Sequence, residues 1–539
     1  MTIPEQVLDI VEKNGDRVFL VDALTESSMK YREFHQLACV LAAELHLRGL
    51  RRGDRLGVMV PNCRELAVLY FACLYAGVTI VPINPNLSVS DVRFILSSCD
   101  PGLVVASASL CGRLTAAGSA PIALATSQDP LPDSKTAAIE LTSIKQSSLK
   151  QSTEFRVLEG VTADDLLVIV YTSGTTARPK GLAHKIGRMF HNARAFAEQQ
   201  GIGHASRFYL TLSMAYMGGF YNLLILPFLK GASVVIDHVF DARSSLSFWD
   251  RASRHQANTL WLAPTVMSIL LKMDRGRLGE NFCRNSVLRS FVGFAPLPLK
   301  LKAEFEARYG VRMIENYGLS ETLFVTARST ASGSGTGYVG EALPGIELRV
   351  VGEDGSVLPP HADGEIQILT PDLMAGYLDE KGHLKVVNAE EWFSTGDFGR
   401  VDQSGALFVT GRKKDIIIRG GINISPAAIE EVLLQGKGIV DAAVVSIPHE
   451  LYGEDIVAVL KLEPDVELES ILDSVMERAR QELAVHQQPA RYVAIDDFPR
   501  TANGKLQKAQ LRELVVGKLQ MGSGSFLGTR PTVTSKASD

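Results

Sequence analysis

Eleven consecutive residues, 171–181, bring together groups suited to holding a phosphate. The segment reads Tyr-Thr-Ser-Gly-Thr-Thr-Ala-Arg-Pro-Lys-Gly and follows an apolar run at 166–170. Its glycines let the backbone approach an anion, its backbone N–H groups can form an anion-binding concavity, and its hydroxyls and cations add donors and charge. A Walker loop is excluded, because Lys180 precedes the second glycine and Pro179 interrupts the segment. Phosphate binding is favoured over the alternative, a polar turn that follows a core strand.

Three polar positions further along the chain carry a carboxylate or an amine at a predicted turn. Glu321 lies in the segment 316–322, Asn-Tyr-Gly-Leu-Ser-Glu-Thr, and offers the hard oxygen that Mg²⁺ prefers. Asp397 follows a glycine, and a carboxylate in such a turn can reach the hydroxyls of a ribose. Lys505 follows an Asn-Gly pair, where a loop can swing. Taken singly, these positions are typical of a polar turn, a turn-capping Asp and an exposed Lys.

The elements that must position these residues alternate between helix and strand patterns. Apolar residues recur with helical spacing over 31–45, and a strand pattern covers 55–60. A helix is predicted at 64–76, stopped by Gly77 and followed by a strand at 78–81. Such alternation implies a parallel or mixed sheet with helices on its faces.

Further elements follow from the same patterns. The segment 103–160, rich in Ser, Thr and Ala, predicts surface connections. The remaining predictions are a buried strand at 166–170, a helix at 184–200, strands at 231–236 and at 259–265 (ended by Pro264), a helix at 299–308 stopped by Gly310, a small β subdomain of short strands from 340 onward, and a small α/β domain at 430–518.

The polar segments, in their order and spacing, resemble those of the adenylate-forming (AMP-binding) superfamily. That superfamily comprises acyl-CoA synthetases and similar carboxylate–CoA ligases, amino-acid adenylating domains and firefly-type luciferases. The matching segments are 171–181, 288–298, 316–322, 392–397 and 411–430, and the resemblance covers about residues 15–515. The implied α/β fold has a large N-terminal domain of mixed sheets flanked by helices, with a β subdomain, and a small mobile C-terminal α/β domain. The expected boundaries are 1–412, 413–518 and a disordered Gly/Ser/Thr-rich tail at 519–539.

The resemblance implies an ATP site and a catalytic set of Lys505, Glu321 and Thr175. Tyr317 would stack on adenine, Asp397 would hold the ribose hydroxyls, and Glu321 would hold Mg²⁺ against the phosphates. Lys505 would neutralise negative charge in the adenylation transition state. The implied ATP-binding residues are Thr172, Ser173, Gly174, Thr175, Thr176, Lys180, Gly293, Phe294, Ala295, Asn316, Tyr317, Gly318, Ser320, Asp397 and Arg412.

The resemblance also places an acyl pocket beside the nucleotide. Its predicted residues are Tyr216, Gly219, Phe220, Phe294 and Leu319, mostly apolar. Tyr216 is equally well explained as an ordinary aromatic at a strand end. Phe294 stands where relatives carry a small residue, so it either shortens the tunnel or stacks on adenine. No Asp lies between 206 and 222, where amino-acid adenylating domains carry one, which disfavours an α-amino acid substrate.

The segment 411–430 resembles the hinge between the two domains, with Lys414 at the pivot. Gly420 and Gly421 would let a thiol-bearing arm pass near the acyl group. Ile418 stands where relatives often carry Lys, which leaves the details of thiol-acceptor binding open. A charged surface hairpin is the alternative interpretation of this segment.

Composition sets limits on location and partners. The net charge of −5 disfavours nucleic acid as a partner, and six cysteines without a C-x-x-C spacing favour reduced thiols in a cytosol. The N-terminus lacks the pattern of a signal peptide, and the last three residues are not a peroxisomal signal. The longest apolar run, 66–82, is short for a bilayer and is broken by Gly77 and Pro82, so no stable membrane span is expected. We predict a cytoplasmic protein whose oligomeric state the sequence leaves open.

The resemblance predicts an AMP-forming acid–thiol ligase that uses ATP, Mg²⁺ and coenzyme A. It would convert a hydrophobic aryl or alkyl carboxylic acid to acyl-AMP with release of pyrophosphate, then transfer the acyl group to coenzyme A. One alternative is loading of the acyl group onto the phosphopantetheine arm of an acyl carrier protein. Another is a nucleotide-binding relative without catalysis, which Lys505, Glu321, Asp397 and Arg412 argue against. Luciferase-type oxidation is possible on this scaffold, but no residue singles it out.

Overall fold

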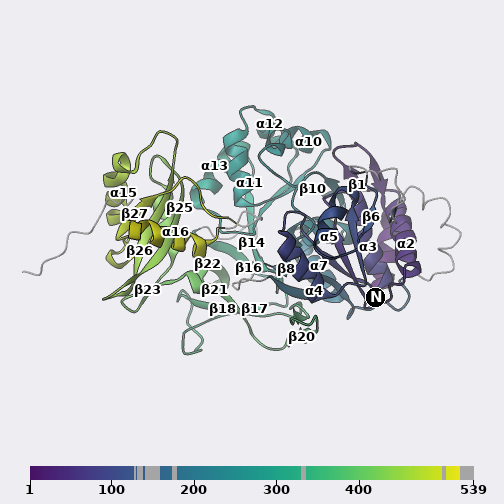
Figure 1. Ribbon diagram of the computed structural model, residues 1–539. Coiled ribbons are helices and arrows are strands. Elements are labelled where there is room, and N and C mark those ends of the chain that lie inside the picture. The colour runs from purple at the N-terminus through teal and green to yellow at the C-terminus, as the bar shows by residue number, and fades with distance from the viewer. Residues whose placement is uncertain are drawn as a thin grey trace, which may run out of the picture.

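Three sheets with flanking helices build the molecule. The computed structural model describes residues 1–126, 129, 138–139, 158–172, 179–328, 335–500 and 506–521. Figure 1 shows the purple N-terminal and teal central parts packed together, with the yellow-green C-terminal part attached at one end. The expected α/β fold, with a large N-terminal and a smaller C-terminal domain, is confirmed.

The first sheet has nine strands within the described residues. It holds the described residues at the two ends of the predicted phosphate segment, 171–181. β8 pairs antiparallel with β9, and Thr172 lies opposite Lys180 in their ladder. β8 is buried, as its apolar sequence predicts. In spatial order the strands are β20 (Leu384–Val386), β19 (Gly376–Leu378), β9 (Lys180–Lys185), β8 (Leu166–Thr172), β4 (Thr79–Pro82), β3 (Arg55–Met59), β5 (Leu103–Ser107), β6 (Ile122–Leu124) and β7 (Ala138–Ile139).

The second sheet, of thirteen strands within the described residues, changes its pairing at β14. From β14 to β1 the neighbouring strands run parallel, whereas β14 pairs antiparallel with β15. In spatial order the strands are β17 (Glu347–Val351), β18 (Gly364–Leu369), β21 (Phe393–Val401), β22 (Ala406–Arg412), β16 (Tyr338–Ala342), β15 (Leu323–Ala327), β14 (Met313–Leu319), β13 (Arg289–Val292), β12 (Thr259–Leu262), β10 (Arg207–Leu210), β11 (Ser233–Ile236), β1 (Val18–Asp22) and β2 (Ser28–Lys30).

One hydrophobic core joins these two sheets. Helix α3 is buried along its length and ends at Gly77, whose φ of 65° confirms the predicted stop. The helices of this part are α1 (Ile3–Asn14), α2 (Tyr31–Leu47), α3 (Arg64–Ala76), α4 (Val89–Cys99), α5 (Cys111–Ala116), α7 (Ile186–Gln199), α8 (Met217–Phe220), α9 (Leu226–Leu229), α10 (Phe248–Arg254), α11 (Pro264–Met273), α12 (Leu278–Ser286) and α13 (Leu299–Tyr309).

The C-terminal part has a sheet and core clusters of its own. Its strands are β23 (Ile417–Arg419), β24 (Ile422–Ile424), β25 (Ile439–His449), β26 (Gly453–Leu462) and β27 (Arg491–Ala494), and its helices are α14 (Pro426–Leu434), α15 (Leu468–Glu482) and α16 (Lys508–Met521). Helix α16 therefore runs past the expected start of the tail at 519, and residues 522–539 lie outside the described residues.

Several sequence predictions of elements were wrong. The helix predicted at 184–200 begins at Ile186, because residues 180–185 form β9 against β8. Pro264 does not end a strand but opens α11 in its first turn, where its missing N–H costs nothing. Residues 103–124 are not surface connections throughout, since β5 and β6 lie in the nine-stranded sheet.

The short strands after residue 340 also differ from the expectation. β16, β17, β18, β21 and β22 pair antiparallel with one another, as a β subdomain would, but they also join the parallel strands through β15 and β14 in one thirteen-stranded path. Among the described residues, no helix is both long enough and apolar enough to cross a membrane.

Candidate functional site

A carboxylate from β21 and a guanidinium from the neighbouring strand β22 meet a phenol from β14. The Tyr317 hydroxyl donates to Asp397 Oδ2 at 2.7 Å, and Arg412 Nε lies 2.7 Å from Asp397 Oδ1. Burial, together with the charge of Asp397, holds the pKa of Tyr317 well above its usual value, so its hydroxyl stays protonated and donates. Three predicted residues from distant segments are thus brought together.

Local strand structure places Asp397 differently from the expectation. It lies within β21, paired with Arg412 of β22, instead of in a turn. Gly396 before it has a φ of 69°, which suits glycine. Thr395 accepts a hydrogen bond from the backbone N–H of Asp397 at 3.0 Å and donates to the carbonyl of Ile366 at 2.8 Å, which fixes the strand beside the carboxylate.

The segments around Gly293 and Asn316 meet at the carboxyl ends of parallel strands β13 and β14. Asn316 Nδ2 donates to the carbonyl of Val292 at 3.0 Å. A Cβ on Gly293 would lie 3.0 Å from Asn316 Oδ1, so the Asn316 side chain packs against the backbone of Gly293. Gly318 is also required, since a Cβ there would lie 2.0 Å from the carbonyl oxygen of Leu323. Ligands bind at this edge in open α/β sheets.

Phe294 adopts a backbone conformation that favours a small residue, with φ 74°. Its ring lies against Gly218 of α8, where an added Cβ would come within 2.6 Å of the ring. The sequence left open whether Phe294 shortens the acyl tunnel or stacks on adenine. The contact with Gly218, next to the predicted acyl residue Gly219, favours the first alternative. Ala295 next to it is exposed.

The predicted acyl residues occupy different environments. Tyr216 is half-buried, and its hydroxyl accepts a hydrogen bond from Asn84 Nδ2 at 2.7 Å. Leu319 is also half-buried, and Gly219 is packed too closely against the backbone of residue 213 for any side chain. Phe220 has no exposed surface and stacks on Tyr70 with ring centroids 5.0 Å apart. Phe220 therefore belongs to the core instead of lining an open tunnel.

Glu321 lies in the short turn between β14 and β15. The Tyr377 hydroxyl donates to Glu321 Oε1 at 2.9 Å. Within the described residues, no three His, Cys, Asp or Glu side chains gather as a metal site. A single partly exposed carboxylate fits Mg²⁺, which proteins commonly bind through one or two carboxylates plus substrate phosphates. Ser320, beside it, is half-buried.

Part of the predicted phosphate site lies outside the described residues. This applies to Ser173, Gly174, Thr175 and Thr176, and to Lys505 near the C-terminus. Thr172 and Lys180, which flank the first group, are paired in the β8–β9 ladder. The exposed Lys180 lies with its Nζ 6.0 Å from the centroid of the Tyr377 ring. Lys180 is thus separated from Glu321 by one aromatic side chain.

The predicted hinge lies between β22 and β23. Lys414 is exposed in the turn Lys413–Asp415. Gly420 and Gly421 have φ values of 59° and 79°, so both positions favour glycine. Sequence reasoning gave no role to Arg419, which is buried and pairs with Asp455 at 3.0 Å.

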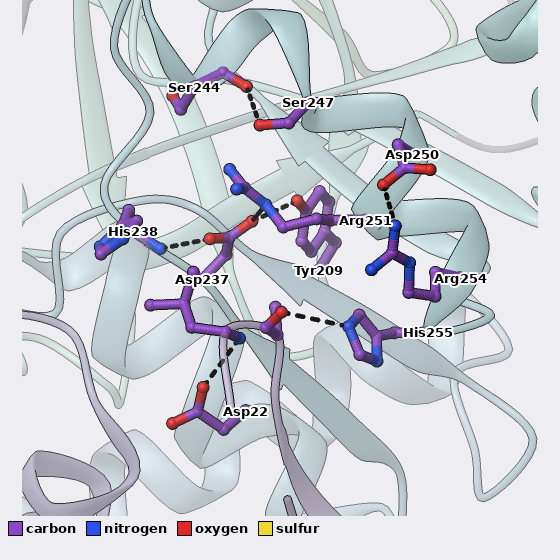
Figure 2. Close-up of polar contacts among 12 residues, drawn as sticks. Asp22, Tyr209, Asp237, His238, Ser244, Ser247, Asp250, Arg251, Arg254 and His255 are labelled. Atoms are coloured by element: carbon purple, nitrogen blue, oxygen red, sulfur yellow. Dashed lines mark hydrogen bonds and ion pairs between the residues drawn. The ribbon is translucent and has the colours of Figure 1, made fainter. Parts of the chain in front are cut away.

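A second buried carboxylate, Asp237, lies just beyond β11 and received no role from the sequence. Figure 2 shows it between Tyr209, Arg251 and His238. The Tyr209 hydroxyl donates to Oδ2 at 2.5 Å, Arg251 Nε donates to the same oxygen at 2.6 Å, and the backbone N–H of His238 donates to Oδ1 at 2.7 Å. The charge of Asp237 is already paired with Arg251, so Asp237 is not available to pair the ammonium group of an amino-acid substrate.

Comparisons with known proteins agree with this geometry. The family model described as "AMP-binding enzyme" matches residues 8–378, and "AMP-binding enzyme C-terminal domain" matches 428–505. The chain is 30% identical over 507 residues to an indoleacetate–CoA ligase of Aromatoleum aromaticum, covering 92% of this chain and 95% of that protein. It is 28% identical over 505 residues to a sulfoacetate–CoA ligase of Cupriavidus necator, covering 92% and 94%. The crystal structure of ATP-bound MatB from Rhodopseudomonas palustris superposes with a TM-score of 0.79 at 26% identity, covering 94% and 98%.

Proposed function

The chain belongs to the AMP-binding enzyme family, and from that premise we propose that it is an AMP-forming acid–thiol ligase that joins a carboxylic acid to coenzyme A. The observation that carries the proposal is the meeting of Tyr317, Asp397 and Arg412 beside the Asn316–Gly293 contact. These residues come from four segments, and together they suit the ribose and adenine of a nucleotide.

The reaction has two steps at one site. In the first, a carboxylate oxygen attacks the α-phosphorus of ATP, the bond to the β-phosphate oxygen breaks, and pyrophosphate leaves. In the second, the thiol of coenzyme A, having lost its proton, attacks the carbonyl carbon of acyl-AMP, and AMP leaves as the thioester forms. Negative charge develops on phosphoryl oxygens in the first step, so fixed donors and cations are expected to dominate catalysis. No covalent bond to the protein is required.

The described residues bind and orient the nucleotide in this proposal. Asp397 accepts hydrogen bonds from the ribose hydroxyls, Arg412 holds Asp397 and contacts the ribose and phosphate, and Tyr317 stacks on adenine. Glu321 would hold Mg²⁺, which supplies positive charge against the phosphate oxygens. Thr175 and its neighbouring hydroxyls would bind the phosphates, and Lys505 would neutralise the transition state. The roles of Thr175, its neighbouring hydroxyls and Lys505 remain predictions, since these residues lie outside the described residues.

We propose domain boundaries at 412 and 413, with rotation about Lys414 between the two steps. In support, β22 is the last strand of the thirteen-stranded sheet along the chain and ends at Arg412. The first strand of the C-terminal sheet begins at Ile417, and the exposed Lys414 lies between the two. Rotation would remove Lys505 after adenylation and bring Gly420 and Gly421 toward the acyl group. One site would then serve both steps.

The acid proposed is hydrophobic, aryl or alkyl, which places the enzyme in fatty-acid or aromatic-acid metabolism. The two relatives compared above are named for indoleacetate and sulfoacetate, so the acid must be argued from local residues. Phe294 against Gly218, and the half-buried Leu319, give the region an apolar lining. A cytoplasmic location is proposed because ATP and coenzyme A are available there and all six cysteines are free.

The test is an assay of pyrophosphate release with a panel of acids, each with and without coenzyme A. We expect acid-dependent release of pyrophosphate, and thioester formation only when coenzyme A is present. Weak response to coenzyme A with strong response to an acyl carrier protein would identify the carrier as the acceptor. Absence of nucleotide cleavage with every acid would contradict the proposed function.

A further inference from the structure

The turn that carries Glu321 is short and conformationally demanding. It joins β14 to β15, and Leu323 at its end has φ 59° although it is buried and not a glycine. A branched side chain in this left-handed conformation persists only where surrounding contacts hold it. The contacts that hold this turn are therefore informative.

Three hydrogen bonds reach the turn from the nine-stranded sheet and the loop leading into it. The Tyr377 hydroxyl of β19 donates to Glu321 Oε1 at 2.9 Å, and the backbone N–H of Met374 donates to the carbonyl of Glu321 at 2.7 Å. The Nε2 of His184 in β9 donates to the carbonyl of Ser320 at 2.6 Å. β9 and β19 are themselves paired, Tyr377 opposite Leu182, so the donors form one rigid unit.

His184 can act only as a hydrogen-bond donor from Nε2 at this position. Burial lowers its pKa to about 4, so the ring is neutral and carries one proton. Because the carbonyl of Ser320 can only accept, that proton lies on Nε2. The other ring nitrogen, Nδ1, is buried without a hydrogen-bond partner among the described residues.

Helix α7 holds the backbone on either side of these hydrogen bonds. Arg188 Nη1 donates to the carbonyls of Leu373 at 2.5 Å and Met374 at 3.0 Å. Asn192, also on α7, donates from Nδ2 to the carbonyl of Phe324 at 2.9 Å and accepts from its N–H at 3.0 Å. The turn is thus fixed both at Glu321 and at its exit into β15.

Tyr377 also joins two parts of the proposed triphosphate site. Lys180 Nζ lies 6.0 Å from the centroid of its ring, while its hydroxyl holds Glu321. Lys180 belongs to the predicted phosphate segment and is the first residue of β9. One tyrosine therefore sets the spacing between a phosphate-side cation and the metal-side carboxylate.

We infer that Tyr377 and His184 are positioning residues that aim Glu321 at the metal of a bound metal–nucleotide complex. This inference rests on the proposed function and deepens it. The Tyr377 hydroxyl donates to Oε1 of Glu321, so Oε2 would be the oxygen that holds the metal. Carboxylates that bind metals are commonly oriented by such hydrogen bonds, and removal of the donor typically costs about 10- to 100-fold in metal affinity.

The decisive variant is Tyr377→Phe, which removes one hydroxyl and keeps the ring beside Lys180. Its matched control is Tyr338→Phe, because Tyr338 donates to Glu341 Oε1 at the same distance, 2.9 Å, within the thirteen-stranded sheet. Calorimetric titration with an ATP analogue whose α,β bridge is methylene would be made twice, with Mg²⁺ and with EDTA. The quantity compared is the ratio of the two dissociation constants.

We expect Tyr377→Phe to weaken binding with Mg²⁺ by about tenfold and to leave metal-free binding within twofold. The control should change neither constant. Equal weakening with and without Mg²⁺, or no weakening, would overturn the inference. A wild-type protein that binds the nucleotide equally well in both conditions would instead contradict the proposed function.

His184 gives an independent test. His184→Gln keeps an N–H donor that can reach the Ser320 carbonyl, whereas His184→Leu removes it. We expect the Gln variant to keep most of the Mg²⁺-dependent affinity and the Leu variant to lose it. Identical affinities for two folded variants would show that the hydrogen bond to Ser320 does not position Glu321. Should either variant fail to fold, Tyr377→Phe decides the inference by itself.

Discussion

Two clusters in this protein place the same two residue types around a buried aspartate. In one, Tyr317 and Arg412 contact Asp397, and in the other, Tyr209 and Arg251 contact Asp237 (Figure 2). Each pairs a phenol O–H and a guanidinium N–H with one carboxylate. Residue types alone therefore cannot tell a nucleotide site from a structural cluster.

The clusters differ in how the arginine and the carboxylate are surrounded. The Arg412 side chain is 46% exposed and that of Arg251 only 17%. Asp237 additionally accepts from the backbone N–H of His238, whereas Asp397 accepts from Tyr317, the residue after Asn316, whose side chain lies against Gly293. A half-exposed arginine beside the proposed nucleotide-binding edge can exchange protein contacts for ligand contacts. An enclosed one can only hold the fold together.

The largest expected effect is on the stability of the Asp237 cluster. Asp237→Asn leaves the largely covered charge of Arg251 without its partner, which costs up to about 3–5 kcal/mol, the range found for fully buried pairs. Urea unfolding should show that loss, while the KM for ATP of the folded protein changes less than twofold. A stable Asp237→Asn variant with impaired ATP use would reverse the assignment of the two clusters.

The reciprocal change, Asp397→Asn, should act on activity. Removing the charge weakens the hydrogen bonds to Arg412 and to the proposed ribose, and bonds to charged groups contribute about 1.5–3 kcal/mol. We expect kcat/KM for ATP in pyrophosphate release to fall about 10- to 100-fold, with a smaller change in unfolding free energy than for Asp237→Asn. Unchanged kinetics would remove Asp397 from the site.

The sequence predicted elements well where one apolar pattern and one stop residue agree. The helix at 64–76 ends at Gly77, and the helix from 299 ends before Gly310, because both glycines adopt the left-handed conformation that closes a helix. It failed at β9, because the short strand Lys180–Lys185 is held between β8 and β19, and β19 is distant in sequence.

Site residues likewise were predicted where a local sequence motif marks them and missed where long-range packing decides. The resemblance named Tyr317, Asp397 and Arg412, and the structure brings them together, although Asp397 lies in a strand instead of a turn. It also named Phe220, which the structure places in the core against Tyr70. Tyr377 received no role from the sequence, because its contact with Glu321 depends on the packing of two sheets.

The smallest expected effects come from the two tyrosines, and they separate the clusters most finely. Each Tyr→Phe change removes one hydrogen bond while the carboxylate keeps its charge and its arginine, so we expect a loss of about 1 kcal/mol, below the range for removal of the charge itself. Tyr209→Phe should lower the unfolding free energy and leave ATP use unchanged, whereas Tyr317→Phe should raise the KM for ATP about fivefold, the factor that corresponds to 1 kcal/mol. Initial rates over a range of ATP concentrations, with urea unfolding at pH 8, measure both quantities.

The pH dependence of stability tests whether both phenols are buried as neutral donors. Burial raises the pKa of Tyr209 and of Tyr317 above the ordinary value of 10, so the unfolded chain loses these protons before the folded protein does. The stability they contribute is therefore complete below pH 10 and is lost as pH rises above 10. Either Phe variant should show a shallower decline between pH 10 and 11 than the wild type. A decline in Tyr317→Phe as steep as in the wild type would show that this phenol ionises freely, and would remove the basis for treating the two clusters as chemically alike.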